Sequence, residues 1–404
     1  MSAPIIIVGA AQAGLQLAES LRAEGYDGPL TLIGDEAHAP YQRPPLSKAF
    51  LLGDMAEDRL VLRGPDALAA KGIDLITSAP VVTIDRAART VTLADGRRLP
   101  YRGLALTTGS RPRQLPVAGA TLDGVLMLRT IDDSRRIREG IASASRVAVI
   151  GGGFIGLEIA AAASKAGKSV TVFEALDRLL ARTSTELISD FFFDLHTTHG
   201  VDIRLATQVT GLVGSDRVTA VATGDGHTHA ADLVVVGIGI LPNAELATAC
   251  GLACDRGIVV DACSRTSDPL LVAAGDCTAR RMPDGTLLRL ESVQNAIEQA
   301  KSAAAALLGK ERPFTASPWF WSDQYDVRLQ MAGLTVGHDT TAVRGSIAER
   351  KFSVFYFKDD TLIAVDSINR APDHIAARKL LDAGRSPPVA QASDEAFALA
   401  ALAK

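Results

Sequence analysis

The sequence is poor in cysteine. Only four of its 404 residues are cysteine, and all of them, Cys250, Cys254, Cys263 and Cys277, lie in one short region. This spacing fits neither a disulfide framework nor a zinc site, and Cys250 and Cys254 are one residue too far apart for a thioredoxin-like motif. We therefore expect reduced, buried thiols, with a redox-active pair as the alternative.

Long apolar runs and an excess of one charge are also absent. No 18 uncharged apolar residues follow one another, and the N-terminus has no basic stretch leading into an apolar one. The 46 acidic and 42 basic side chains give a net charge of −4, so the overall charge does not favour binding of a nucleic acid. These properties predict a cytoplasmic protein that binds neither nucleic acid nor membrane.

Histidine is scarce as well. The seven histidines form no dense cluster, so no metal site is expected. We interpret His196 and His199 as belonging to an ordinary helix end.

What the sequence does contain is a repeated strand–turn–helix pattern. The stretch "VAVIGGGFIGLEIAAAASKAGKSVTVFEA" (147–175) carries the complete dinucleotide fingerprint Gly151, Gly153 and Gly156. Glu174 ends the next predicted strand 18 residues after Gly156, where a carboxylate can accept both hydrogen bonds of a ribose diol and repel a 2′-phosphate. NAD is therefore favoured over NADP, although Arg178 and Arg182 lie just downstream and could serve a phosphate.

The first copy, "IIIVGAAQAGLQLAESL" (5–21), has Ala11 at the position of the middle glycine. That methyl group lies near where a pyrophosphate would approach the helix N-terminus, so an ordinary turn is the alternative to a nucleotide site. Gly9 and Gly14 are present, and Asp35 follows 21 residues after Gly14 as a ribose ligand or a solvated loop acid. The complete second copy makes two nucleotide sites the favoured interpretation, because alanine at a helix start needs no positive φ.

The rest of the chain alternates short strand-like segments with turns. They are "VVTID", "TVTLADG", "GLALTTG", "ADLVVVGIGILPN" and "PLLVAAGDCTA". Asp276 follows a glycine at the last strand end, where it could bind hydroxyl groups or cap a following helix. After about Ser317 the sequence becomes an aromatic-rich alternation typical of an antiparallel sheet, with a helix at "DHIAARKLLDAG".

Six motifs in order now make a family resemblance specific. They are "YQRPPLSK" (41–48), "TTGSRPR" (107–113), "GLE" (156–158) after the second fingerprint, "AAGDC" (273–277), "ESVQNAIEQA" (291–300) and "PWFWSDQYD" (318–326). The chain resembles the NADH-dependent ferredoxin reductases of cytochrome P450 and ring-hydroxylating dioxygenase systems, such as putidaredoxin reductase and rubredoxin reductase, and the related apoptosis-inducing-factor group.

The resemblance implies an α/β fold of two Rossmann-like nucleotide-binding domains plus a C-terminal α+β domain. It predicts a discontinuous FAD-binding domain (residues 1–109 and 242–317), an inserted NAD-binding domain (110–241) and a C-terminal reductase domain (318–404). The segment "HAPYQRPPLSKAF" contains no cysteine, so disulfide reduction by a thiol beside the flavin is not expected.

The resemblance also assigns site residues. For FAD they are Gly9, Ala13, Gly14, Asp35, Arg43, Lys48, Val81, Arg129, Asp276, Val293 and Trp319, although Val81 and Val293 could simply fill core. For NAD they are Gly151, Gly153, Phe154, Ile155, Gly156, Glu158, Glu174, Arg182 and Gly239. Lys48 and Glu158 are the predicted catalytic pair, with a surface ion pair as the alternative, and Trp319 and Trp321 either cover the flavin, meet a partner or pack in the core.

The implied partner is a [2Fe-2S] ferredoxin. Because ferredoxins are commonly acidic, a local basic surface formed by Arg280, Arg281, Arg289 and Arg328 is predicted to dock it, with ordinary solvated arginines as the alternative. We expect a monomer or weak dimer. NADH or quinone oxidase activity, or a nucleotide-binding regulator with little turnover, are the competing functions.

Overall fold

The computed structural model describes residues 3–402, which divide into two compact units. One unit consists of the chain up to Gln42 together with Glu57–Arg111 and Leu241–Pro318. The other consists of Arg43–Ala56, Pro112–Ile240 and the chain from Trp319 onward. Each unit is therefore discontinuous in sequence, and the domain boundaries derived from the sequence stay a prediction.

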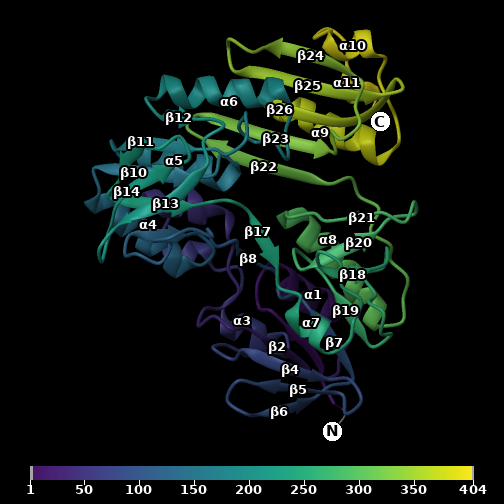
Figure 1. Ribbon diagram of the computed structural model, residues 1–404. Helices are drawn as coiled ribbons and strands as arrows, with labels where there is room; N and C mark the ends of the chain where they lie inside the picture. Colours follow the sequence, from purple (N-terminus) through teal and green to yellow (C-terminus); the bar gives the residue numbers. More distant parts are fainter. Residues whose placement is uncertain (1–2, 403–404) are drawn as a thin grey trace. The chain divides into compact units, whose positions relative to one another are not determined.

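A five-stranded parallel sheet forms the centre of the first unit. Its order is β19 (Leu271–Ala273), β7 (Gly103–Leu106), β1 (Ile5–Val8), β2 (Leu30–Ile33) and β3 (Ile73–Ile76). Helices α1 (Gln12–Ala23) and α8 (Val293–Leu307) pack against each other beside it (Figure 1). All four residues of β1 are buried, because helices or further strands cover both faces of such a sheet.

Two short three-stranded sheets, the first antiparallel and the second mixed, complete the first unit. One contains β4 (Val81–Asp85), β5 (Thr90–Leu93) and β6 (Arg98–Pro100), and another contains β18 (Ile258–Val260), β20 (Thr278–Arg281) and β21 (Leu287–Leu288). The helix expected directly after Asp276 is wrong. Strand β20 follows instead, and the next helix, α8, is capped by Ser292, whose side chain accepts a hydrogen bond from the Asn295 amide.

The second unit repeats the parallel architecture. Its sheet has the order β12 (Asp202–Arg204), β11 (Ser169–Phe173), β10 (Arg146–Ile150), β16 (Leu233–Val236) and β9 (Val125–Met127). The helices around it are α4 (Ile131–Ser143), α5 (Phe154–Lys165) and α6 (Glu186–Thr198). A small antiparallel sheet contains β13 (Val209–Gly214), β14 (Val218–Thr223) and β15 (Thr228–Ala230).

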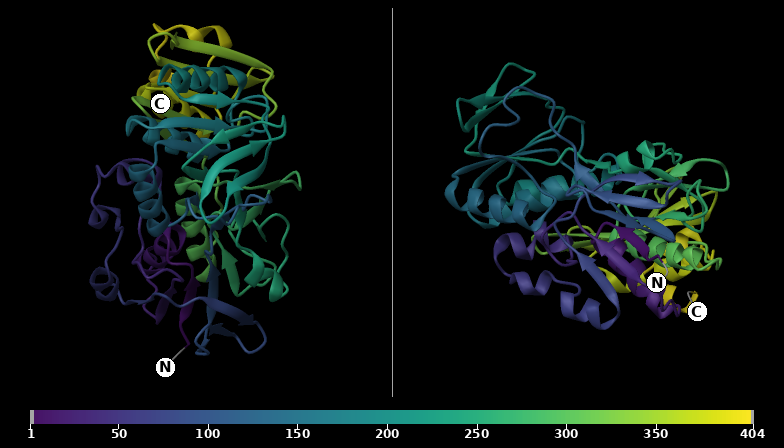
Figure 2. Two further views of the ribbon diagram at one scale, coloured as in Figure 1. Left: turned by 60° about the vertical axis from the view of Figure 1, so that its left-hand side comes forward. Right: turned by 90° about the horizontal axis from the view of Figure 1, so that it is seen from below.

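A five-stranded antiparallel sheet ends the second unit, as the aromatic-rich alternation predicts. Its order is β22 (Trp319–Gln324), β23 (Val327–Gly333), β26 (Thr361–Ile368), β25 (Lys351–Lys358) and β24 (Thr340–Ser346). One face packs against α6, and the other against α9 (Ala371–Asp382), α10 (Val389–Ser393) and α11 (Leu399–Leu402), seen in the left view of Figure 2.

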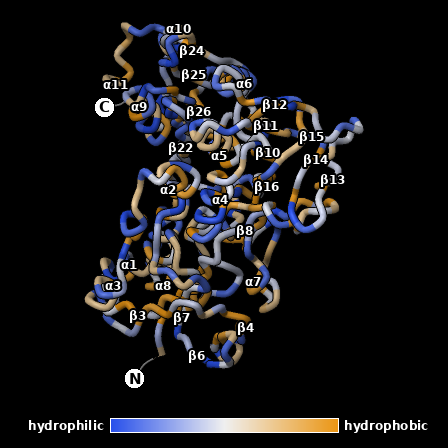
Figure 3. The backbone as a smooth tube through the Cα atoms, turned by 90° about the vertical axis from the view of Figure 1, so that its left-hand side faces the viewer, coloured by the Kyte–Doolittle hydropathy of each residue, from blue (hydrophilic) through white to orange (hydrophobic). Residues whose placement is uncertain are grey.

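Hydrophobic segments alternate with hydrophilic loops along the backbone (Figure 3). Among residues 3–402, no helix is long and apolar enough to cross a membrane. The α/β fold class predicted from the sequence is confirmed by the two parallel sheets with their helices.

Candidate functional site

Both strand–turn–helix copies form the same tight turn. Gly9 follows β1 with φ +111° and Gly151 follows β10 with φ +106°, a conformation that favours glycine. A Cβ atom on Gly9 would lie 2.2 Å from the Thr107 carbonyl oxygen, and one on Gly151 would lie 2.5 Å from that of Gly237. The first glycine of each fingerprint is therefore required by both conformation and space.

The third glycine of each copy lets the helix approach the turn. A Cβ atom on Gly14 would lie 1.9 Å from the Gly9 carbonyl oxygen, and one on Gly156 would lie 2.1 Å from that of Gly151. No side chain fits at either position. The two copies thus share a backbone geometry that the sequence repeat predicts.

The middle position explains how Ala11 is tolerated. Ala11 and Gly153 are both the N-cap residue of their helices, with extended backbones of φ −103° and −82°. Neither side chain caps the helix, and a Cβ atom on Gly153 would meet nothing within 4 Å. Free amide groups at each helix start favour an anion such as a dinucleotide diphosphate, and the space beside Gly153 is open.

Glu174 lies beside the second turn. Its carboxylate accepts hydrogen bonds from the Gly152 amide at 2.6 Å and the Leu176 amide at 2.9 Å, so it is anchored next to the fingerprint. Strand pairing places Glu174 directly after Phe173, whereas the matching position after Ile33 in the first unit is Gly34. Asp35 is therefore one residue further along, and it is exposed.

Several residues predicted for FAD meet within the first unit. A Cβ atom on Gly275 would touch that of Ala13 at 3.2 Å, so the loop carrying Asp276 lies against the start of α1. Ser110 donates a hydrogen bond to Asp276 at 3.0 Å, and Gln299 accepts one from the Gly275 amide at 2.7 Å. The other predicted residues of this unit sit at element starts, Val81 in β4 and Val293 in α8.

The second unit holds the remaining predicted FAD residues. Arg43 donates to the Arg129 carbonyl oxygen at 2.6 Å, which brings these two predicted residues together. Lys48 directly follows the 3₁₀ helix η1 (Pro44–Ser47), and its ammonium group lies 2.7 Å from the Glu158 carboxylate. The Glu158 side chain is only 1% exposed and that of Lys48 is 17% exposed, so this ion pair is buried rather than a surface pair.

The predicted NAD residues all lie in the second unit. Phe154 and Ile155 begin α5, and Phe154 packs against Phe320 with ring centroids 4.9 Å apart. Arg182 lies over Gly239, since a Cβ atom on that glycine would be 3.0 Å from the guanidinium group. Contact of any of these residues with a bound nucleotide stays a prediction.

Trp319 and Trp321 are on β22 with ring centroids 5.6 Å apart. Both are partly exposed, so neither is a fully buried core side chain. The Arg378 guanidinium group lies 4.6 Å from the Trp319 ring centroid. Covering a flavin and meeting a partner both remain predicted roles.

The four predicted docking arginines differ in their surroundings. Arg280 donates to the Phe314 carbonyl oxygen at 2.7 Å and stacks on that ring. Arg289 pairs with Glu291, and Arg328 pairs with Asp323. Arg281 is exposed, and the other three are already engaged within their own units.

All four cysteines are free thiols, and Cys263 and Cys277 are buried. Burial raises the pKa of the Cys277 thiol to about 11 and also raises the pKa of the Cys250 thiol. The described part of the chain contains no group of three or more histidine, cysteine or acidic residues that could hold a metal ion.

Sequence reasoning missed two serines that bind Glu158. Ser47 donates to its carboxylate at 2.5 Å and Ser322 donates at 2.6 Å. The alternation in "PWFWSDQYD" carried a signal, because Ser322 and Gln324 share a strand face with the inward Phe320. Polar residues on an otherwise apolar face indicate a buried polar partner.

Two family models and several known proteins match this chain. The pyridine nucleotide-disulphide oxidoreductase family matches residues 3–300, and the reductase C-terminal family matches residues 319–403. Rhodocoxin reductase of Rhodococcus erythropolis is 48% identical over 397 residues, covering 98% of this chain and 93% of that protein. The anthranilate 1,2-dioxygenase system ferredoxin–NAD(+) reductase component of Burkholderia cepacia is 43% identical over 404 residues, covering 98% of each.

A solved structure agrees with these sequence relatives. The covalent putidaredoxin reductase–putidaredoxin complex contains a chain that superposes with a TM-score of 0.96 at 43% identity. The match covers 99% of this chain and 98% of that one. The resemblance and the fold inferred from the six sequence motifs are confirmed.

Proposed function

Since the chain belongs to the pyridine nucleotide-disulphide oxidoreductase family, and within it to the ferredoxin reductases, we propose that it passes electrons from NADH through FAD to a [2Fe-2S] ferredoxin. The ferredoxin in turn serves a cytochrome P450 or a ring-hydroxylating oxygenase. FAD and NAD(H) are the cofactors of this family of enzymes.

One observation carries the proposal: each unit contains a nucleotide-type turn of matching geometry, and Glu158 on the helix after the second turn forms a buried ion pair with Lys48. Two turns provide for two dinucleotides, which is what a flavoenzyme that oxidises NADH needs. When bound, FAD accepts a hydride from NADH and releases electrons one at a time, so the protein needs no nucleophile of its own.

The chain's residues then bind, orient and supply charge. In the proposed arrangement, Gly9, Gly14 and Asp276 hold FAD, and the second fingerprint with Glu174 holds NADH. Lys48 provides a positive charge that favours an electron-rich ring, and Glu158 fixes the Lys48 ammonium group at 2.7 Å. A carboxylate at Glu174 favours NADH, because it repels a 2′-phosphate.

The docking surface, location and assembly belong to the proposal as well. Arg281 and Arg328 are exposed members of the predicted basic group, and Arg328 pairs with Asp323. Arg280 and Arg289 are partly buried, and they contribute charge while they contact Phe314 and Glu291. The proposed enzyme is a cytoplasmic monomer or weak dimer, with the domain division given by the sequence.

The experiment is anaerobic mixing of the purified FAD-containing protein with NADH, followed by ferredoxin-dependent reduction of cytochrome c. The proposal predicts rapid bleaching of the flavin absorbance and cytochrome reduction that requires the ferredoxin. NADH oxidation that consumes oxygen equally with and without the ferredoxin would instead identify an oxidase. Failure of NADH to bleach the flavin at all would leave only a regulatory role.

A further inference from the structure

The Glu158 carboxylate is held by three donors from two separate segments. Lys48 and Ser47 approach one oxygen, Oε2, and Ser322 donates to the other, Oε1, at 2.6 Å. Ser322 is completely buried, so its hydroxyl has no access to bulk water. Both carboxylate oxygens are therefore bound, and each is fixed from a different direction.

Ser322 is itself the end of a longer chain of hydrogen bonds. The Gln324 amide donates to the Ser322 hydroxyl at 3.1 Å, and the Gln324 carbonyl oxygen lies 2.7 Å from Nε2 of His196. Behind it, the Tyr325 hydroxyl lies 3.4 Å from Nδ1 of the same histidine. Gln324 is 1% exposed and His196 is fully buried.

The hydrogen bonds that run from His196 to Glu158 all have the same donor-to-acceptor direction. Burial lowers the pKa of the His196 imidazole to about 4, so near neutral pH the ring carries one proton. Because the Gln324 amide nitrogen donates to Ser322, its carbonyl oxygen must accept from His196, which places the proton on Nε2. Every donor in the chain then points toward Glu158, and the bond dipoles align head to tail.

The two strand faces of β22 keep this chain separate from the tryptophans. Phe320, Ser322 and Gln324 alternate with Trp319, Trp321 and Asp323 along the strand. The first set packs toward α5 and α6, whereas Trp319 meets Arg378 of α9. The last turn of α6 provides His196, so three elements meet in the buried chain.

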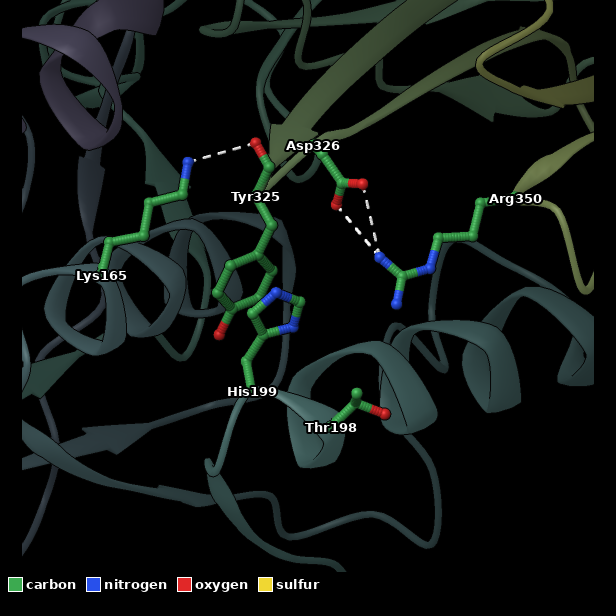
Figure 4. A pocket seen from close by; sticks show the side chains of 6 residues that line it. All are labelled: Lys165, Thr198, His199, Tyr325, Asp326 and Arg350. Carbon is green, nitrogen blue, oxygen red and sulfur yellow. Dashed lines mark hydrogen bonds and ion pairs between the residues drawn. The ribbon is translucent and has the colours of Figure 1, made fainter.

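The far end of the chain reaches a pocket of about 420 Å³ on the second unit. There the Tyr325 and His199 rings stack at 3.7 Å, Lys165 donates to the Tyr325 carbonyl oxygen, and Arg350 pairs with Asp326 (Figure 4). The stacked ring limits the movement of Tyr325, so the outer end of the chain is held in place.

We propose that Ser322, Gln324 and His196 are positioning residues that fix the Glu158 carboxylate, and through it the Lys48 ammonium group, for hydride transfer. This inference rests on the proposed function. A glutamine amide does not ionise, so the chain orders the carboxylate and carries no proton. Without it, one oxygen of Glu158 loses its donor and the carboxylate can rotate about its own side-chain bonds.

The first test compares Ser322→Ala with the matched control Ser353→Ala. Ser353 is an equally buried serine of the same sheet, and it bonds Ser367 and Asp373 rather than the chain. The limiting rate of flavin reduction by NADH in the FAD-loaded protein should fall about tenfold in Ser322→Ala, as small displacements of a positioned group cost rate. The NADH dissociation constant should stay within about twofold.

Further variants separate positioning from general loss of stability. Ser322→Thr keeps the hydroxyl and should restore most of the rate, whereas Gln324→Leu should resemble Ser322→Ala. Equal limiting rates in Ser322→Ala and the parent, or equal losses in Ser322→Ala and Ser353→Ala at matched FAD content, would overturn the proposal. If NADH does not reduce even the parent, the proposed function has failed instead.

A second readout needs no turnover. Nitrogen NMR of the FAD-loaded protein with labelled histidine should show His196 as the Nε2–H tautomer, assigned by loss of its signal in His196→Gln. In Gln324→Leu the Nε2 resonance should shift, because its acceptor is gone. An Nδ1–H tautomer in the parent would reverse the direction of the chain and overturn the proposal.

Discussion

At the scale of single residues, the middle position of the dinucleotide fingerprint tolerates a residue other than the usual glycine. The first and third glycines leave no room for a side chain, because a Cβ atom there would meet a backbone oxygen at about 2 Å. The middle position has an extended backbone in both copies, so Ala11 is accepted without backbone strain, and a Cβ atom on Gly153 in the other copy would meet nothing within 4 Å. The sequence shows Ala11, but it does not show which fingerprint positions lack room for a side chain, because that depends on distances between backbone atoms.

Replacing Ala11 with glycine should therefore change little. FAD should be bound at one equivalent per chain in both proteins, and the free energy of unfolding should differ by less than about 1 kcal/mol, because the residue is an N-cap with no side-chain hydrogen bond. The ratio of flavin to protein absorbance checks this prediction. A parent that binds no FAD beside a glycine variant that binds it fully would show that the methyl group blocks the site.

Besides its predicted role in binding the ribose of NADH, the Glu174 carboxylate accepts hydrogen bonds from the Gly152 and Leu176 amides. Glu174→Gln removes the charge but keeps one acceptor, and Glu174→Ala removes both. The preference of kcat/KM for NADH over NADPH should narrow by about 1–3 kcal/mol in the alanine variant. The glutamine variant should lie between it and the parent. A parent with equal values for the two nucleotides contradicts this role of Glu174.

At the scale of elements, most of the fold follows from local patterns. Alternation predicted the C-terminal sheet, and β25, β26 and helix α9 lie where the sequence indicates them. The helix expected directly after Asp276 was wrong, because a glycine–aspartate pair after a strand suits a helix start and a strand connection equally well. The hydrogen bonds that join Ser322, Gln324 and His196 were not predicted, because His196 and Gln324 are 128 positions apart and no local pattern encodes such a contact.

The C-terminal sheet also buries a titratable group. Asp366 on β26 is 1% exposed and accepts a hydrogen bond from Tyr356 at 3.0 Å, and desolvation raises its pKa to about 7. Its folded-state pKa lies above the unfolded value near 3.8. The contribution of Asp366 to the free energy of unfolding is therefore greatest below pH 4 and is lost as the pH rises toward 7.

Asp366→Asn removes that titration. As the buffer goes from pH 4 to pH 8, the melting temperature of the variant should rise relative to that of the parent. The corresponding change in the difference between their free energies of unfolding should be on the order of a few kcal/mol. Differential scanning fluorimetry of both proteins across this range measures it. A constant difference between the two melting temperatures would mean that Asp366 ionises equally in both states.

At the scale of the whole molecule, charge is nearly balanced, with a net charge of −4. Attraction of an acidic ferredoxin must then come from a local patch rather than from the overall field. Arg280 is a poor choice for charge reversal, because its guanidinium group is engaged with Phe314. Arg281 can be reversed without breaking such a contact.

Arg281→Glu should slow ferredoxin-dependent cytochrome reduction several-fold at low salt, and the two rates should converge as ionic strength rises. Arg98→Glu makes the same charge change at another exposed arginine of the same unit and serves as the control. Reduction of ferricyanide by NADH should be unchanged in both variants. Equal ferredoxin rates in Arg281→Glu and Arg98→Glu would place the docking surface elsewhere.

Alternate residues of strand β22 face opposite sides and make different contacts, which affects how the sequence of such an enzyme can change during evolution. Changes at 319, 321 and 323 alter the face that carries the tryptophans and leave the Glu158 anchor in place, whereas changes at 320, 322 and 324 do the reverse. Point substitutions can therefore alter one face of β22 while the other face stays unchanged. Insertion or deletion of one residue within β22 would instead disrupt both faces. A shift by one residue exchanges the two faces and would put a tryptophan against the Glu158 carboxylate.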